Sequence, residues 1–214
     1  MPGTRFDVVL FDLLTALLDS WTLWNRIAGS EENGRKWRAA YLHRTYEAGR
    51  YRPYETLVAQ AATEAGLPPG LAACLTARYH ELKPWPEARD VLGTLRRMGL
   101  RLGVVTNCSE VLRATAVSCT GVEFDVVVTA ERAGYYKPDS RPYQQALAEL
   151  GATASQCLFV AGSAYDLFGA SKIGLPTYWH DRIGMKPPPN MPAPLAYHRT
   201  LHPLLDVVHE RSAK

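Results

Sequence analysis

Residues 8–20 read VVLFDLLTALLDS, an apolar run that ends on Asp12 and continues into a loop of leucine, threonine and alanine. The run is short and does not alternate, which is typical of a strand buried on both faces of a parallel sheet. A charged residue directly after such a strand is often a helix cap, and otherwise a functional group. The stretch therefore raises the question whether Asp12 is a nucleophile, a metal ligand or a residue that has lost its function.

Further apolar runs repeat this pattern, and segments with helical spacing lie between them. The runs cover residues 101–106, 124–129, 157–161 and, more weakly, 176–180. The segments 86–99 and 140–151 each place apolar residues on one stripe and end on a glycine, as amphipathic helices do. This alternation predicts a doubly wound α/β fold with a parallel sheet.

Residues 20–82 break the alternation. Four amphipathic helical segments fill this range, separated by glycine, proline and polar turns. The block is too long for one crossover helix and follows the first strand, whose carboxyl end is the edge where open α/β sheets bind ligands. We therefore expect a helical cap of residues 20–82 on a catalytic core of residues 1–19 and 83–214. Within that core, residues 185–214 are expected to be irregular before a short terminal helix.

Composition argues against several classes of function. The net charge is only +3 and is not clustered, unlike the dense basic stripe of a nucleic-acid-binding protein. The four cysteines match no zinc spacing, and no apolar run reaches the roughly 18 residues that span a bilayer. We expect a cytoplasmic protein that binds a small anionic substrate and neither nucleic acid nor membrane. Its aromatic-rich cap leaves room for a homodimer.

Each of the first four predicted strands leads to groups that can do chemistry. These are Asp12, then Thr106 and Asn107, then Lys137, and finally Ser163 and Asp166. All of them belong to the same rim of a parallel sheet, which predicts one shared site. There Asp12 would attack an electrophilic carbon or phosphorus, and Lys137 would keep Asp12 ionised. Asp166 would orient Lys137 or activate water.

With these elements in this order, the sequence resembles the haloacid dehalogenase superfamily of hydrolases over nearly its whole length. Its four motifs are matched by LFDLLTALLDS (10–20), VVTNCS (104–109), YYKPDSRPY (135–143) and LFVAGSAYDLFGA (158–170). The third match is the most specific, with the family residues at Lys137, Pro138, Asp139, Arg141 and Tyr143. The resemblance implies a Rossmann-like core with an inserted helical cap and Asp12 as nucleophile.

Two branches of the superfamily compete for this chain. Phosphatases use a second Asp two positions past the nucleophile as general acid–base, and Leu14 stands there. They also hold Mg²⁺ with an Asp four residues before the last motif Asp, and Gly162 stands there. Mg²⁺ prefers carboxylate oxygens, and only Asp12 and Asp166 remain to supply them. A phosphatase with Mg²⁺ as cofactor is therefore disfavoured, but it stays open as an alternative.

The other branch, the L-2-haloacid dehalogenases, needs no metal or other cofactor. The segment KWRAAYLHRTYEAGRY (36–51) resembles its cap and places Arg38 where the branch binds the leaving halide. The remaining matches are Asn107 to a second halide contact, Thr106 to a serine that holds the substrate carboxylate, and Lys137, Tyr143 and Asp166 to further site residues. By this resemblance Asp12 displaces halide from C2 with inversion, and water then releases a 2-hydroxy acid from the ester.

The pocket lining departs from this branch. Thr15 and Ala16 stand where the family has Gly and then Thr, so the usual supporting hydroxyl is missing at its place. Thr15 substitutes for it only if the loop shifts. Ser163 stands at an Asn position and Tyr165 at a Trp position. We include Thr15 and Ser163 among the substrate-binding candidates, and a catalytically altered or non-catalytic member remains a third hypothesis.

Overall fold

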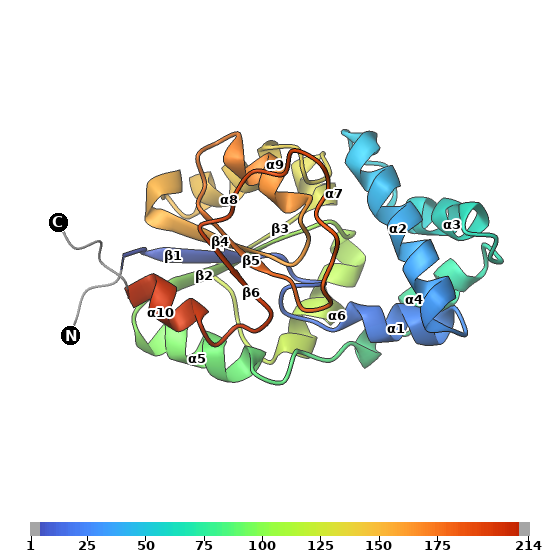
Figure 1. Cartoon of the computed structure of the whole chain (residues 1–214), viewed down its shortest axis with the longest axis horizontal. Helices are drawn as coiled ribbons and strands as arrows, with labels where there is room; N and C mark the ends of the chain where they lie inside the picture. Colours follow the sequence, from blue (N-terminus) through green and yellow to red (C-terminus); the bar gives the residue numbers. More distant parts are fainter. Residues whose placement is uncertain (1–4, 210–214) are drawn as a thin grey trace.

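Six parallel strands form one sheet in the computed structural model, which describes residues 5–209. The strands are β1 (Val8–Phe11), β2 (Arg101–Thr106), β3 (Val126–Thr129), β4 (Cys157–Ala161), β5 (Thr177–His180) and β6 (Ala196–His198). Their order across the sheet is β3-β2-β1-β4-β5-β6, and every neighbouring pair is parallel (Figure 1). The chain winds outward from β1 in both directions, which confirms the doubly wound α/β fold.

Helices cover both faces of this sheet. They are α5 (Ala88–Arg97), α6 (Glu110–Thr120), α7 (Ala130–Ala133), α8 (Arg141–Glu149), α9 (Asp166–Ser171) and α10 (Leu204–His209), with a 3-10 turn η2 (Ala154–Gln156) before β4. Successive strand residues point to opposite faces. Val9 and Phe11 therefore share an apolar cluster with α5, α6 and α10, whereas Val8 and Leu10 share another with α8 and α9. Because both faces of the sheet are covered, a central strand such as β1 is apolar at every position.

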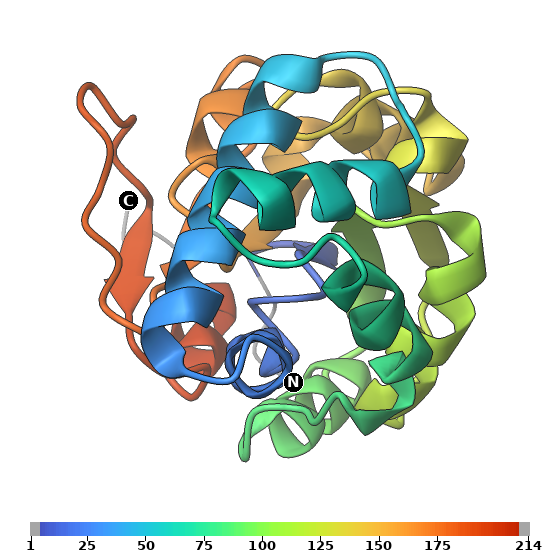
Figure 2. The same ribbon diagram turned by 90° about the vertical axis from the view of Figure 1, so that its right-hand side faces the viewer.

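The helical insertion, residues 20–82, separates β1 from α5. It contains α1 (Ser20–Ile27), α2 (Glu31–Ala48), α3 (Tyr54–Glu64), α4 (Leu71–Ala77) and the 3-10 turn η1 (Tyr79–Glu81). Aromatic rings fill its centre, with the Trp24 ring 4.5 Å from that of Trp37 and 5.4 Å from that of Tyr41. The insertion lies beyond the carboxyl ends of the strands, and α2 crosses in front of that edge (Figures 1 and 2).

Two short segments, residues 17–20 and 82–85, connect the insertion to the core. They run side by side as a hinge ribbon, because Leu18 and Pro84 form an antiparallel bridge. The N–H of Asp19 donates to the Lys83 carbonyl at 2.8 Å, and the N–H of Trp85 donates to the Leu17 carbonyl at 2.9 Å. The insertion therefore leaves and re-enters the core at one place, next to the loop that carries Asp12.

The C-terminal part differs from expectation. Residues 196–198 form the edge strand β6, which pairs with β5 where irregular chain was predicted. This strand has only three residues and none is fully buried, so it carries no apolar pattern that a sequence could display. The terminal helix α10 begins at Leu204, whereas residues 210–214 of the prediction lie outside the described residues.

Among the helices formed within residues 5–209, none combines the length and the apolar character that crossing a membrane requires.

Candidate active site

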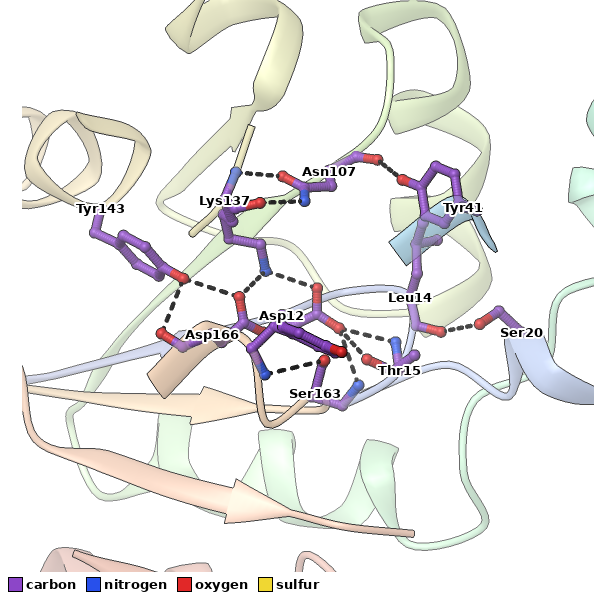
Figure 3. A network of polar contacts seen from close by, with 12 residues as sticks. Asp12, Leu14, Thr15, Ser20, Tyr41, Asn107, Lys137, Tyr143, Ser163 and Asp166 are labelled. Carbon is purple, nitrogen blue, oxygen red and sulfur yellow. Dashed lines mark hydrogen bonds and ion pairs between the residues drawn. The ribbon is translucent and has the colours of Figure 1, made fainter. Parts of the chain in front are cut away.

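The carboxylates of Asp12 and Asp166 meet the ammonium group of Lys137 at the carboxyl edge of the sheet (Figure 3). Lys137 Nζ lies 2.9 Å from Oδ1 of Asp12 and 3.0 Å from Oδ1 of Asp166. All three residues are buried. Asp12 directly follows β1, Asp166 begins α9, and Lys137 lies between α7 and α8. The fold thus gathers two negative charges and one positive charge from three distant segments.

Burial and ion pairing set the protonation of this cluster. Burial raises the pKa of Asp12, but the Lys137 charge and hydrogen bonds from Thr15 outweigh it, and the pKa lies below its ordinary value. For Asp166 burial prevails over Lys137, so its pKa is raised. Burial lowers the pKa of Lys137, yet the two carboxylates raise it above its ordinary value. Asp12 therefore holds its negative charge more firmly, and Asp166 is the carboxylate more ready to accept a proton.

The loop after β1 directs three donors at the other oxygen of Asp12. Oδ2 accepts from the N–H of Thr15 at 2.9 Å, from Thr15 Oγ1 at 2.5 Å and from the N–H of Ala16 at 3.3 Å. The hydroxyl that the sequence lacks at its usual place thus comes from Thr15. Its contact is with the nucleophile candidate, and the residue also lines the cavity described below.

Gly162, just after β4, makes room for this threonine. A Cβ atom on Gly162 would lie 2.2 Å from Thr15 Oγ1 and 2.3 Å from the backbone nitrogen of Ala16. Real Cβ atoms essentially never show such distances. A side chain at position 162 would therefore collide with the Thr15 hydroxyl and with the backbone of residues 15 and 16, so this loop needs glycine at position 162.

The apolar composition of the loop explains how it is held. Leu13, Leu17 and Leu18 are completely buried, so the loop packs into the core. Its backbone N–H groups and the Thr15 hydroxyl are left to face Asp12. The leucines, which look unsuited to a catalytic loop, thus hold this loop in place by packing into the core.

Two side chains behind the loop bind its carbonyl groups, and the sequence did not indicate either. The indole N–H of Trp85 donates to the Thr15 carbonyl at 2.9 Å, and Nδ1 of His180 lies 2.9 Å from the Ala16 carbonyl. Because a carbonyl only accepts, His180 carries its proton on Nδ1. Burial lowers the pKa of His180, which favours this neutral form. Both residues occur in apolar surroundings, where an indole or imidazole is indistinguishable in sequence from core.

Two predicted substrate contacts, Asn107 and Tyr143, have other partners, whereas the buried hydroxyl of Thr106 has none among the described residues. The Asn107 amide donates to the Lys137 carbonyl at 3.0 Å and accepts from the Lys137 N–H at 2.8 Å, although Asn107 also lines the cavity. The Tyr143 hydroxyl donates to Oδ1 of Asp166 at 2.8 Å. Thr106 is completely buried and does not belong to the cavity lining. Asn107 and Tyr143 thus support charged residues of the cluster, and the structure does not bring Thr106 to it.

A cavity of about 50 Å³ lies between the cluster and the helical insertion. The core contributes a polar wall that includes Asp12, Thr15, Lys137, Ser163 and Asp166. The insertion contributes Trp21, Arg38, Tyr41, Leu42, Thr45 and Tyr46. At roughly 10–15 Å³ for each water molecule, the cavity holds a few waters or one small molecule.

Arg38 is a buried cation on the insertion side of this cavity. Its exposed fraction is 3%, and its guanidinium lies 4.8 Å from the ring centroid of Trp21 and 5.0 Å from that of Trp24. Within residues 5–209, its Nε and Nη1 atoms are buried without a hydrogen-bond partner. Burying a charge without a counter-ion is costly. Arg38 is therefore a buried cation on the wall of the cavity and a candidate binding group for an anion.

The donor set does not suit a divalent cation. In the described part of the chain, no three His, Cys, Asp or Glu side chains form a metal-binding group. Lys137 lies between the two carboxylates, and a third carboxylate at position 162 would collide with Thr15. The hard oxygen ligands that Mg²⁺ requires are therefore not assembled here.

Replacing Lys137 with methionine should expose the role of the buried pair. We expect the variant to lose about 3–5 kcal/mol of unfolding free energy near pH 7, the cost of breaking a buried ion pair. The lowered pKa of wild-type Asp12 stabilises the fold above the unfolded carboxyl pKa of about 4, and this contribution fades as the pH falls. Without Lys137, burial raises the pKa of Asp12. Acid then protonates the buried carboxylate and stabilises the variant, because no uncompensated charge remains at this position. Urea titrations near pH 7 and near pH 4 measure the difference in unfolding free energy between wild type and variant. We expect a smaller difference at the acid pH, and equal differences at both would contradict this account.

The pairing of Thr15 with Gly162 can be tested by a double-mutant cycle. Gly162→Ser should cost about 1–3 kcal/mol through overpacking, and adding Thr15→Gly should recover only part of it, because the backbone of residues 15 and 16 still lies against the new Cβ atom. Gly70→Ser is the control, because a Cβ there meets no atom within 4 Å. Denaturant titration gives the unfolding free energies of the four proteins of the cycle and of the control, and strictly additive effects would refute a contact between the two side chains.

Comparisons with known proteins agree with this geometry. The family profile "haloacid dehalogenase-like hydrolase" matches residues 6–174. The chain is 38% identical over 108 residues to (S)-2-haloacid dehalogenase of Pseudomonas sp. (strain YL), covering 50% of this chain and 47% of that protein. It is 37% identical over 103 residues to phosphatase MT3486 of Mycobacterium tuberculosis (strain CDC 1551 / Oshkosh), covering 47% and 48%. Both matches span about half the length of the relative.

A solved structure is similar over the whole fold. The L-2-haloacid dehalogenase RSc1362 has a TM-score of 0.85 and 28% identity, covering 97% of this chain and 100% of that one. The family match extends from just before β1 into the segment after α9, and it includes the residues of all four motifs. The chain belongs to the haloacid dehalogenase-like hydrolases.

Proposed function

We propose that this protein hydrolyses the carbon–halogen bond of small (S)-2-haloacids through an ester on Asp12. One observation carries the proposal: a buried guanidinium that has no counter-ion among residues 5–209 lines the same small cavity as an ionised carboxylate. An alkyl halide needs a nucleophile on one side of carbon and an anion site for the departing halide on the other. The relative and the solved structure named as 2-haloacid dehalogenases support this substrate class. The helical insertion acts as the cap that closes the site.

The geometry assigns different tasks to the two oxygens of Asp12. Oδ2 is held by the three loop donors, whereas the contact of Oδ1 is Lys137 Nζ. Oδ1 forms the bond to C2 while the carbon–halogen bond breaks on the opposite side, which inverts C2. The halide leaves with the bonding electron pair toward Arg38, whose guanidinium stays charged and offers several donors.

Hydrolysis of the ester reuses the same loop. Water attacks Cγ of Asp12, and Asp166 accepts one water proton because burial has raised its pKa. Negative charge then develops on Oδ2, where the N–H and hydroxyl of Thr15 and the N–H of Ala16 already point. Collapse breaks the bond between Cγ and Oδ1, and Oδ1 leaves with the bonding electron pair and takes the proton from Asp166. The new carboxyl group of Asp12 then loses the second water proton and is again a carboxylate. The 2-hydroxy acid keeps Oδ1, and one proton is released with the halide.

The phosphatase alternative lacks two parts of its machinery. Leu14 lines the cavity at the position of the general acid, and an alkyl side chain has no proton to give. Gly162 stands where the Mg²⁺ carboxylate would be, and Thr15 occupies the space. We therefore propose a metal-independent reaction, in which Lys137 supplies the positive charge beside the nucleophile.

Halide release by the purified protein tests the proposal. With 2-chloropropionate and bromoacetate, the wild type should release halide equally with and without a chelator. Asp12→Asn should lower kcat at least about a thousandfold, as loss of a nucleophile does. One turnover in water labelled with heavy oxygen should label Asp12 and leave the product unlabelled. Phosphate release from an aryl phosphate that requires Mg²⁺, without halide release, would establish the phosphatase instead.

Arg38 offers a second test, with a matched control on the same helix. Arg38→Met should lower kcat/KM by about 100-fold, the cost of removing a donor at a developing charge. Its melting temperature should not fall, because the replaced charge is buried without a partner. Arg35→Met removes an exposed arginine one turn earlier that pairs with Glu31, and it should leave activity unchanged. Parallel loss of activity and stability in Arg38→Met would indicate a structural role.

A further inference from the structure

The cavity in front of Asp12 has an open end and a closed end, both lined by α2. Tyr46 marks the open end, since its side chain is 42% exposed and contacts the Tyr165 ring edge to face at 5.3 Å. Arg38 marks the closed end and is 3% exposed. Eight positions separate these two residues, which is about 12 Å of helix.

Trp21 forms the wall at the closed end. Next to it lies a second, more open hollow of about 340 Å³, in which Trp85 and Ile183 are the apolar lining besides Trp21 and the other lining residues are polar or charged: Asp19, Thr22, Asn25, Glu31, Arg35 and Arg182. Among the described residues, Trp21 alone lines both spaces. A cavity of about 50 Å³ and a hollow of about 340 Å³ thus share one lining residue, Trp21.

The position of this wall is tied to the anion site. The Arg38 guanidinium lies over the Trp21 ring at 4.8 Å, an arrangement in which cation and ring attract each other. Asp19 caps α1 by accepting from the N–H of Thr22 at 3.0 Å, which fixes the helical turn that carries Trp21. A substrate with its halide at Arg38 therefore has the indole directly beside its C2 substituent.

We infer that Trp21 determines the substrate range by limiting the C2 substituent to hydrogen or methyl. This inference rests on the proposed dehalogenation. The substrates are then haloacetates and 2-halopropionates, because a longer alkyl chain at C2 meets the indole. Removing the indole joins the two spaces and lets such a chain extend toward Trp85 and Ile183.

The test compares kcat/KM for bromoacetate, 2-bromopropionate and 2-bromohexanoate across four proteins. In the wild type, 2-bromohexanoate should be at least about tenfold worse than 2-bromopropionate, the discrimination that excess methylenes produce in a closed pocket. Trp21→Ala should raise the ratio of 2-bromohexanoate to 2-bromopropionate at least about tenfold, and Trp21→Phe by less. Trp24→Phe is the control, because Trp24 also stacks under Arg38 but lines neither space. It should change all three substrates alike.

Each outcome bears on one hypothesis. A wild type that hydrolyses 2-bromohexanoate as well as 2-bromopropionate overturns the role of Trp21, even if no variant folds. An unchanged ratio in both Trp21 variants overturns it too, as does an equal change in Trp24→Phe. A folded wild type that releases halide from none of the three acids overturns the proposed function instead.

Discussion

The ammonium of Lys137 between two buried carboxylates is the interaction on which the rest of this site depends. Two carboxylates so close and so deeply buried do not both stay ionised without a cation. Neighbouring groups hold the arrangement, since Asn107 binds the backbone of Lys137 and Tyr143 binds Asp166. The surroundings are unequal: Asp12 has three further donors, whereas burial prevails at Asp166. Two chemically identical side chains thereby become a nucleophile and a proton acceptor.

The loop around Asp12 achieves order through packing. Its leucines are buried, and the side chains of Trp85 and His180 bind its carbonyl groups, so its N–H groups point the other way. Such preorganised donors need no rearrangement when charge develops. Arg38 differs from this loop, because a buried charge without a counter-ion among the described residues lowers the stability of the fold. It gains a favourable interaction only when an anion binds. The core side of the site, around Asp12, is therefore stabilised by many contacts, whereas on the insertion side the burial of Arg38 lowers stability.

Features that repeat locally could be predicted from the sequence, whereas those set by contacts across the fold could not. Apolar runs indicated β1 to β5, and apolar stripes indicated the helices between them, because burial of an element leaves a regular apolar pattern in the sequence. The order of strand ends predicted the ion-paired cluster. Thr106 shows the limit, since its position at a strand end does not reveal whether the side chain lines the cavity. The contact of Thr15 with Asp12 depended on Gly162, almost 150 positions away.

The hinge ribbon has a consequence for the history of such proteins. Its two segments lie side by side, so the 63 residues of the helical insertion, 20–82, start and finish at neighbouring points. A unit of chain with adjoining ends is replaceable as a whole, by a longer, shorter or differently folded one, without rerouting the sheet. The core can therefore keep one reaction centre while recombination supplies new covers. Diversity of substrates then arises by exchange of modules, with the covalent chemistry inherited unchanged.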